Sequence, residues 1–364
     1  MNAGRIIALL GRRDEPTDAV EEYCRYLGDA LGNRGFPMEL ARVSWSERGW
    51  PVALRELRER AREWRGRWVL VQYTALAWSA RGFPLRFLRV LKVLRNCGAR
   101  VGVVYHDVEP YSGARAIDKI RRHAQSRVMR QTLQAAELGI FTAPLNVISW
   151  LAHAPSNAAF IPVGANLPVP APAPLKSDRR EQAPLTVAVF GITEGATGRN
   201  ECKRIADALR FAATNGTRLR LHALGRGASE CEPQLRDALR DVSVEVQVEG
   251  ILPAEQVVEA LSSSDVALFV RAPISSRRGS AIAGIACGLP VLAYAGPETA
   301  PPITEAGVVL VSPEKTELGE ALLRIVSDAA LRESLAVRSR RAYQEHFGWD
   351  AIAGRFVEVL SKRD

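Results

Sequence analysis

The sequence has few cysteines and no paired cysteine motif. Its 364 residues include five cysteines, and none of them forms a Cys-x-x-Cys pair. This spacing excludes a zinc site of the usual kind, and the length excludes a small scaffold held by disulfides. An odd number of scattered thiols is typical of a reducing compartment, so we expect a cytoplasmic location.

Long hydrophobic runs are also missing. The longest stretch without charge, between Glu137 and Lys176, is interrupted by several prolines and asparagines. A membrane-spanning helix needs about 20 predominantly apolar residues, so this stretch does not predict one. Near the start of the chain, the apolar run at Ile6–Leu10 is followed at once by Arg12. We therefore expect a first buried strand there, and no signal peptide.

Positive charge is concentrated in the first half of the chain. The whole sequence has 49 Lys and Arg against 40 Asp and Glu, a net charge of +9. Residues 1–165 hold 25 basic and 15 acidic residues, whereas the remainder is almost neutral. A basic half indicates an anionic partner, such as a phosphate-bearing substrate, an anionic membrane or nucleic acid. The alternative is an arginine-rich composition without a specific partner.

Two segments favour the membrane among these partners. Phe83–Arg95 and Ile117–Arg130 place basic residues beside apolar ones, as a helix at a membrane interface does. A core helix with a basic outer face has the same pattern, so both interpretations stay open. No recognition motif or platform for stacking bases is present, which argues against nucleic acid. We expect peripheral contact with the inner face of a membrane through this basic half.

The organisation of the chain predicts two α/β domains. Residues 168–184 contain alternating Ala and Pro followed by a charged cluster, which is typical of an extended linker. The domains on either side would span residues 1–167 and 185–339. Both contain short β-branched strands that alternate with helices, a pattern that predicts two Rossmann-like parallel sheets facing across a cleft. Ligands of such sheets bind at the carboxyl ends of the strands.

The run Arg277-Arg278-Gly279-Ser280 lies between a predicted strand and a predicted helix. Ser280 would cap the helix, and Gly279 would let a ligand approach the backbone. The free amides of a helix N-terminus and two guanidinium groups together suit a diphosphate. The simpler interpretation is a capped helix that follows a solvated basic loop.

Other glycines and polar residues also follow predicted strands. Gly191 ends one strand and precedes a helix that is predicted from Arg199 and carries Lys203, while Gly225 ends the next strand. No Gly-x-Gly-x-x-Gly or Walker pattern is present.

In the first half, His106 and Asp107 end a buried strand, where a histidine can transfer a proton or pack against its neighbours. Asp18 and Glu21 form a predicted capping box at the start of a helix that ends near Arg34.

These motifs together resemble glycosyltransferase family 4 and its GT-B relatives. The similarity is carried by VEGILPAEQVVEALSSSDVALFV, SSRRGSAIAGIACGLPVLAY and EAGVVLV in the second half, and by VVYHDVEP in the first. The tail FGWDAIAGRFVEVL resembles the closing helix of the family, which implies that residues from about 340 to 364 pack back on the first domain. The family's paired glutamates are replaced by Ser275 and Ala283, and its usual arginine by Ile192. The chain thus resembles a divergent branch with Arg-Arg-Gly-Ser at this place.

The resemblance implies a retaining, metal-independent hexosyltransferase with a UDP- or GDP-linked sugar donor and no further cofactor. Its acceptor would be a glycan, a lipid-linked molecule or a small molecule. The implied catalytic residues are His106, Asp107 and Asp18. The residues implied in donor binding are Gly191, Arg199, Lys203, Gly225, Gly250, Ile251, Leu252, Arg277, Arg278, Gly279 and Ser280. Because both glutamates are missing, the alternative is a catalytically silent GT-B protein that binds a carbohydrate or protein partner.

Overall fold

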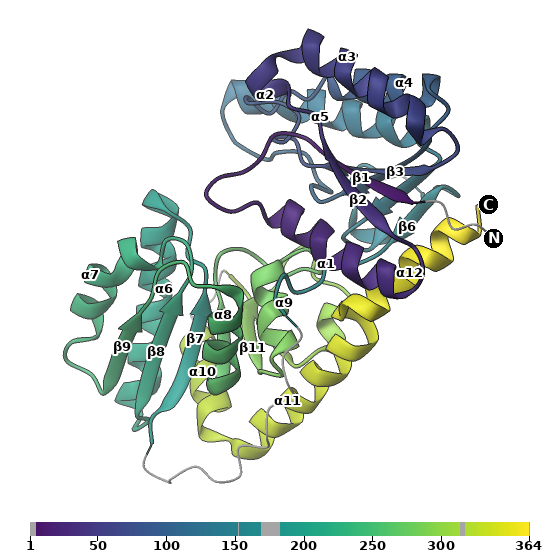
Figure 1. Ribbon diagram of the computed structural model, residues 1–364. Coiled ribbons are helices and arrows are strands. Elements are labelled where there is room, and N and C mark those ends of the chain that lie inside the picture. The colour runs from purple at the N-terminus through teal and green to yellow at the C-terminus, as the bar shows by residue number, and fades with distance from the viewer. Residues whose placement is uncertain (1–4, 152, 169–182, 314–316, 364) are drawn as a thin grey trace. The chain divides into compact units, whose positions relative to one another are not determined.

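The computed structural model describes residues 5–151, 153–168, 183–313 and 317–363 (Figure 1). The chain forms two compact units, one made of Met1–Val163 with Trp349–Asp364 and the other of Gly164–Gly348. Most of the segment predicted as a linker, 168–184, lies outside the described residues. No helix in the described ranges is both long and apolar enough to cross a bilayer.

The first unit contains a six-stranded parallel sheet in the order β2-β1-β3-β4-β5-β6. Every residue of two of its interior strands, β1 and β3, is buried, as expected for a parallel sheet covered by helices on both faces. The strands are β1 (Ile6–Leu10), β2 (Met38–Arg42), β3 (Trp68–Tyr73), β4 (Arg100–Tyr105), β5 (Leu138–Phe141) and β6 (Ala158–Phe160). The helices are α1 (Ala19–Asn33), α2 (Trp45–Arg48), α3 (Trp50–Ala61), η1 (Arg62–Trp64), α4 (Phe87–Asn96), α5 (Ala116–Ala135), η2 (Leu145–Val147) and α12 (Trp349–Ser361).

The last helix of the chain, α12, belongs to this first unit. Its Trp349 stacks on Tyr26 of α1 with ring centroids 5.6 Å apart, and it meets the edge of Tyr23 at 5.4 Å. An ion pair of 2.8 Å between Arg34 and Asp350 joins the same two helices. Tyr23 and Trp349 are buried and Tyr26 is half-buried, and their contacts hold α12 beside α1 (Figure 1).

The second unit also contains a six-stranded parallel sheet, in the order β12-β11-β10-β7-β8-β9. When the strands are counted along the chain from β7, this is the Rossmann arrangement. Its direction of winding reverses between the first strand of the unit, β7, and the fourth, β10. The strands are β7 (Leu185–Phe190), β8 (Leu219–Leu224), β9 (Val244–Val248), β10 (Val266–Phe269), β11 (Val291–Tyr294) and β12 (Val308–Val311). The helices are α6 (Gly195–Thr214), α7 (Ala228–Leu239), α8 (Ala254–Ser263), α9 (Gly279–Ala286), η3 (Ile303–Glu305), α10 (Glu317–Ser327), α11 (Ala329–Ala342) and η4 (Tyr343–Phe347).

The strand orders locate the points where each sheet can bind a ligand. The winding reverses between β7 and β10 in the second unit, and between β1 and β3 in the first. At such a point the loops beyond two neighbouring strands run in opposite directions and leave room for a ligand. The residues after β7 and β10 are therefore the first place to look for a donor site.

Candidate functional site

Three of the predicted glycines meet at the carboxyl edge of the second sheet. The amide of Gly191, after β7, donates to Leu224 O at 2.7 Å, and the amide of Gly225, after β8, donates to Gly250 O at 2.9 Å. Gly225 has a φ of +92°, and a Cβ on it would lie 3.2 Å from Gly191 N. A glycine is therefore required for this close approach of two strand ends. Ile251 and Leu252 follow directly, and the side chain of Ile251 is exposed.

An arginine that the sequence analysis missed lies over this edge. Arg271 follows β10, and its Nη1 is 3.3 Å from the position that a Cβ on Gly191 would occupy. The side chain is exposed, and within the described chain it forms no ion pair. It thus brings a positive charge to the point where the winding reverses. Its only signal in the sequence is its place just beyond the carboxyl end of a strand.

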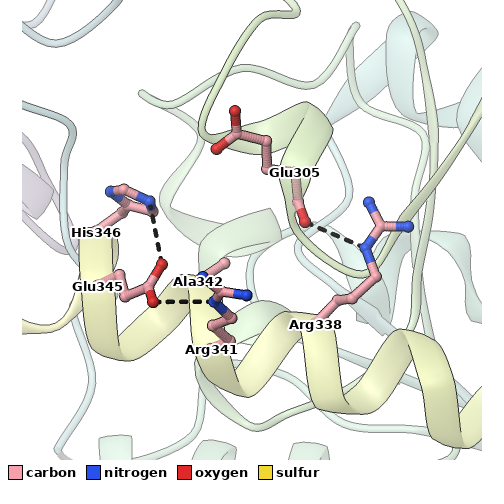
Figure 2. A pocket seen from close by; sticks show the side chains of 6 residues that line it. All are labelled: Glu305, Arg338, Arg341, Ala342, Glu345 and His346. Carbon is pink, nitrogen blue, oxygen red and sulfur yellow. Dashed lines mark hydrogen bonds and ion pairs between the residues drawn. The ribbon is translucent and has the colours of Figure 1, made fainter.

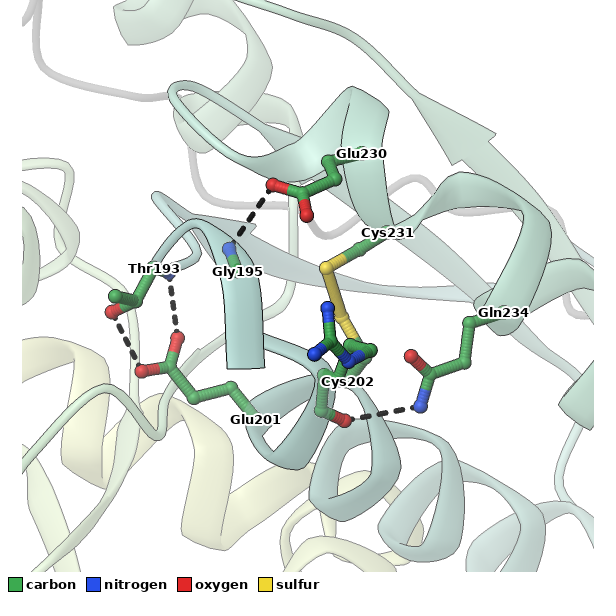
Figure 3. Close-up of a disulfide and its surroundings, with 8 residues drawn as sticks. Thr193, Gly195, Glu201, Cys202, Glu230, Cys231 and Gln234 are labelled. Atoms are coloured by element: carbon green, nitrogen blue, oxygen red, sulfur yellow. Dashed lines mark hydrogen bonds between the residues drawn. A yellow bond between two sulfur atoms is a disulfide. The ribbon is translucent and has the colours of Figure 1, made fainter. Parts of the chain in front are cut away.

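The helix after β7 begins earlier than predicted. It starts at Gly195, so Arg199 lies in its second turn and Lys203 beyond it, and both side chains are exposed. Two carboxylates occupy the loop that precedes it (Figure 3): Glu201 accepts from Thr193 N at 2.8 Å, and Glu230 accepts from Gly195 N at 3.1 Å. The prediction that Arg199 marks the helix start is wrong. These carboxylates also make the α6 N-terminus less suited to an anion than expected.

A disulfide lies next to both carboxylates. Cys202 and Cys231, the residues after Glu201 and Glu230, are bonded and join α6 to α7 (Figure 3). Both cysteines are buried. The sequence predicts reduced thiols, because the two residues are 29 positions apart and no local pattern pairs them, and this prediction is wrong for Cys202 and Cys231. The packing of α6 against α7 brings them together.

The helix after β10 offers free amides near the predicted arginines. Its N-cap is Arg278, with no hydrogen bond from the capping side chain, so the prediction that Ser280 caps it is wrong. The first intrahelical bonds run from Ala281 N and Ile282 N to Arg278 O, which places the amides of Gly279 and Ser280 ahead of them. Such amides, together with the positive end of the helix dipole, attract anions.

The first of the two predicted arginines of this loop is bound to a carboxylate. Arg277 forms a two-point ion pair with Glu298, with Nε–Oε2 at 2.5 Å and Nη2–Oε1 at 2.9 Å. Burial acts to raise the pKa of Glu298, but the hydrogen bonds and charge of Arg277 and the charge of Arg278 outweigh it, so this pKa lies below its ordinary value. Arg277 is therefore bound to a carboxylate in this structure, and its contact with a diphosphate stays a prediction. Glu298 follows β11 and carries no sequence signal that links it to Arg277.

In the first unit, His106 is held in one tautomer. Its Nε2 lies 2.9 Å from Oε1 of Gln72, whose amide nitrogen donates to Leu70 O at 3.1 Å. This orientation of Gln72 makes His106 Nε2 the donor and leaves Nδ1 as the unprotonated nitrogen. Burial lowers the pKa of His106 to about 4, although the charge of Asp18 acts in the opposite direction. The ring is therefore neutral at pH 7, and Tyr23 contacts it edge-on at 4.9 Å.

The two predicted catalytic aspartates both bind main-chain amides. Asp18 caps α1, as predicted, by accepting from Val20 N and Glu21 N at 3.1 Å each. It also forms an ion pair of 3.3 Å with Arg42. Asp107 accepts from Ala75 N at 2.7 Å, which fixes the loop after β3. Both carboxylates thus have contacts that stabilise a loop or a helix end, and His106 has a side-chain partner as well, so the catalytic roles predicted for the three residues stay predictions.

A separate pocket of about 410 Å³ lies beside α11 and η4 (Figure 2). Its two arginines have contacts of their own: Arg338 donates to Glu305 O at 3.2 Å, and Arg341 is paired with Glu345 at 2.9 Å. None of the predicted site residues lines it. In the described ranges, no cluster of three His, Cys, Asp or Glu residues is arranged to hold a metal ion.

Comparison with known proteins gives a likeness in structure alone. A scan of family models found no match to this sequence, and neither did a search of curated proteins. The fold is similar to HepE of Anabaena, solved with UDP, at a TM-score of 0.67 and 16% identity, covering 98% of this chain and all of that one. A glycosyltransferase of Rickettsia africae gives a TM-score of 0.68 at 12% identity, with 100% and 99% covered.

The structural likeness extends to a protein that is described as a putative epimerase and not as a glycosyltransferase. A putative UDP-N-acetylglucosamine 2-epimerase of Listeria monocytogenes gives a TM-score of 0.61 at 11% identity, with 98% and 96% covered. At these identities the comparisons establish architecture, and a shared fold leaves the reaction open. Two six-stranded parallel sheets that match these proteins over their whole length show that this chain has the GT-B fold.

Proposed function

We propose that the chain is a glycosyltransferase that moves a hexose from a UDP- or GDP-linked donor to a glycan, a lipid-linked molecule or a small molecule. The observation that carries this proposal is the set of anion-binding groups at the carboxyl ends of β7 and β10. Arg271 lies over Gly191, and Arg278 precedes the free amides of Gly279 and Ser280. The UDP bound to HepE, which has the same fold, supports a nucleotide donor.

The diphosphate of the donor would lie between these groups. Guanidinium groups bind phosphate oxygens with two hydrogen bonds, and the amides at the start of α9 add the positive end of a helix dipole. The exposed side chains of Arg199 and Lys203 would act at longer range on the same charge. The base and ribose would lie along Gly225 and the backbone of Gly250, Ile251 and Leu252.

These groups also suggest how the reaction proceeds. Negative charge builds on the diphosphate as the bond to the sugar breaks, and preorganised cations and amides stabilise that charge. Basic side chains supply the compensating positive charge here, so we infer that no metal is required. The resemblance to glycosyltransferase family 4 further implies retention at the anomeric carbon. His106 would contact the transferred sugar as a neutral hydrogen-bonding group.

One observation favours a second candidate, a GT-B protein that binds a partner and has no activity. The positions aligned with the family's glutamates hold Ser275 and Ala283, and both are buried. The neighbouring carboxylate, Glu298, is bound to Arg277. A protein of this kind would bind a carbohydrate or a protein and would leave a sugar donor unchanged.

A titration and a product analysis separate these functions. We expect calorimetry to show binding of UDP or GDP, and weaker binding of the corresponding nucleoside. With the sugar donor and an acceptor mixture, chromatography would detect the released nucleoside diphosphate, and NMR would give the anomeric configuration. Binding without turnover of any donor would favour the silent protein. Interconversion of sugar epimers on an intact nucleotide would contradict glycosyl transfer, and no nucleotide binding would contradict both the donor site and the reaction. We also propose that the protein works in the cytoplasm, on the ground that nucleotide sugars are available there; the disulfide between Cys202 and Cys231 removes the argument from reduced thiols.

A further inference from the structure

Exposed hydrophobic side chains gather on one part of the first unit. Among the described residues, eight large hydrophobic side chains are exposed, and five of them lie in two segments, 76–86 before α4 and 111–122 around the start of α5. Their exposed fractions range from 45% for Ile117 to 60% for Ile120. The five are Leu76, Leu85, Tyr111, Ile117 and Ile120. We call the exposed side chains of these two segments the loop surface.

The two segments are fixed to each other. Buried Gln125 of α5 donates to Gly82 O at 2.9 Å and accepts from Tyr111 N at 2.7 Å. Arg121 donates to Arg81 O at 3.0 Å. The Arg121 guanidinium also lies 5.1 Å from the Tyr111 ring centroid. These contacts join the loop before α4 to Tyr111 and to α5, so Leu85, Tyr111, Ile117 and Ile120 lie on elements that are held together.

The part of the chain that contains the loop surface is rich in basic residues. Residues 76–130 contain 12 Lys and Arg but three acidic residues, and each of the three has a partner inside the protein. Asp118 is buried and paired with Arg121 at 2.5 Å, Glu109 accepts from Ser149, and Asp107 binds the backbone of the loop after β3. Arg81, Arg86 and Lys119 are exposed, and within the described chain none of them pairs with a carboxylate.

We propose that the loop surface docks on an anionic lipid bilayer. Branched aliphatic side chains and Tyr111 would enter the interface, and the surrounding basic side chains would lie near the lipid phosphates. Nucleic acid would gain little from exposed isoleucines and leucines, and protein interfaces are depleted in lysine at their centres. Positive charge beside exposed aliphatic side chains therefore favours an anionic lipid bilayer as the partner. The docking requires no donor reaction, so its test is independent of the proposed function.

The test is sedimentation of the full chain with vesicles. We expect it to sediment with vesicles of phosphatidylcholine and phosphatidylglycerol, and to stay in solution with phosphatidylcholine alone. Binding should fall when salt rises from about 0.1 M to about 0.5 M, because charges outside the membrane are screened. Equal binding to both vesicle types without dependence on salt, or no binding to either, would overturn the proposal.

Paired variants test the two components separately. Ile117→Ser with Ile120→Ser should reduce vesicle binding at least tenfold, and Arg81→Gln with Lys119→Gln should reduce it by about fivefold per charge. The controls are Val337→Ser and Arg240→Gln, exposed residues of the second unit that should leave vesicle binding unchanged. Melting temperatures identify any variant that fails to fold. If one of the two double variants does not fold, vesicle binding by the other decides the test.

Two other occupants would be recognised in the same experiments. If the chain is a dimer that Ile117→Ser with Ile120→Ser dissociates, and vesicles do not bind, the loop surface is an interface between copies. If single-stranded DNA binds, loses affinity in the charge variant only, and vesicles do not bind, the surface serves nucleic acid. Either result contradicts lipid docking.

Discussion

The guanidinium of Arg277 and the carboxylate of Glu298 form a two-point ion pair across two loops of the second unit. The closest approach is 2.5 Å, and the side chains are only 18% and 16% exposed. The pair joins the loop after β10 to the loop after β11, directly beside Arg278. It therefore positions the start of α9, and it gives Arg277 a different role from that of its neighbour.

We predict that Arg277→Ala destabilises the protein. The change leaves Glu298 as a mostly buried carboxylate without its main partner, which costs roughly 3 kcal/mol of unfolding free energy. Denaturant unfolding measures this cost. The double variant Arg277→Ala with Glu298→Ala should recover part of it, since no unpaired charge is then buried. Arg240→Ala, which removes an exposed ion pair, should change stability by less than about 0.5 kcal/mol.

The same pair predicts a dependence of stability on pH. The pKa of folded Glu298 is lower than its ordinary value of 4.5, so the folded state favours the ionised form. This stabilisation is complete above the unfolded pKa and is lost as the pH falls through the lower folded value. Unfolding of the wild type and of Glu298→Gln across this range checks it. Parallel pH profiles would contradict the prediction.

Arg271 and Arg278 should matter for phosphate binding. We predict that Arg278→Ala and Arg271→Ala each lower the affinity for a nucleoside diphosphate by about ten- to a hundredfold. The affinity for the nucleoside should change much less. Each removes a charge-assisted hydrogen bond of about 1.5–3 kcal/mol. Calorimetry with both ligands measures the difference. Arg236→Ala, an exposed arginine of α7 paired with Glu232, is the control. Unchanged affinity in either variant would remove that arginine from the site.

His106 gives a second dependence on pH. Its pKa is lowered to about 4 from an ordinary 6.5, so the unfolded chain binds this proton more readily than the folded one. Stability should be complete above pH 6.5 and fall as the pH drops toward 4, by up to about 3 kcal/mol. Unfolding of His106→Asn should lack this part of the pH dependence. An identical profile in wild type and variant would contradict a buried neutral histidine.

The same residue tests the catalytic assignment. We predict that His106→Ala nearly abolishes sugar transfer and leaves nucleotide affinity close to that of the wild type, because the nucleotide would bind to the second unit. Turnover, affinity and melting temperature are measured on one variant. Normal turnover with a lower melting temperature would make His106 a packing residue.

We predict that transfer continues in the presence of excess chelator. In the proposed site, basic side chains and backbone amides neutralise the diphosphate, which is the role that a divalent ion has in other transferases. Turnover with and without chelator measures this. Loss of activity that magnesium or manganese restores would show that the diphosphate is held by a metal.

The cysteines should differ sharply in reactivity. Burial raises the pKa of Cys287 to about 11, and it raises the pKa of the fully buried Cys24 further. Cys97 is partly exposed. Because the thiolate is the reactive form, we expect Cys97 to be alkylated first in the native protein. Mass spectrometry after unfolding should find Cys202 and Cys231 protected until a reductant is added. Early alkylation of either would contradict the disulfide.

The sequence by itself determined the class of fold and most of its strands. The runs WVLVQY at 68–73 and VGVVY at 101–105 are short, rich in β-branched residues and apolar on both faces, a pattern that favours buried parallel strands, and both lie in strands of the first sheet. The predicted residues at strand ends followed from the same pattern. Gly191, Gly225 and Gly250 do meet at one edge, since the carboxyl ends of parallel strands share one side of a sheet. Asp18 caps its helix because capping depends on a few consecutive residues.

Contacts between distant segments were decided by the tertiary structure alone. Glu298 reaches Arg277, Arg271 lies over Gly191, and Cys202 meets Cys231 only because neighbouring strands and helices bring their loops together. No local periodicity encodes such pairs. The start of α6 was misplaced for a related reason: Glu201 of the helix itself holds the loop before it through Thr193, and Glu230 of α7 accepts from its first residue, Gly195. A residue's sequence position fixes its backbone neighbours, and the packing of the sheet and helices fixes which charge it meets.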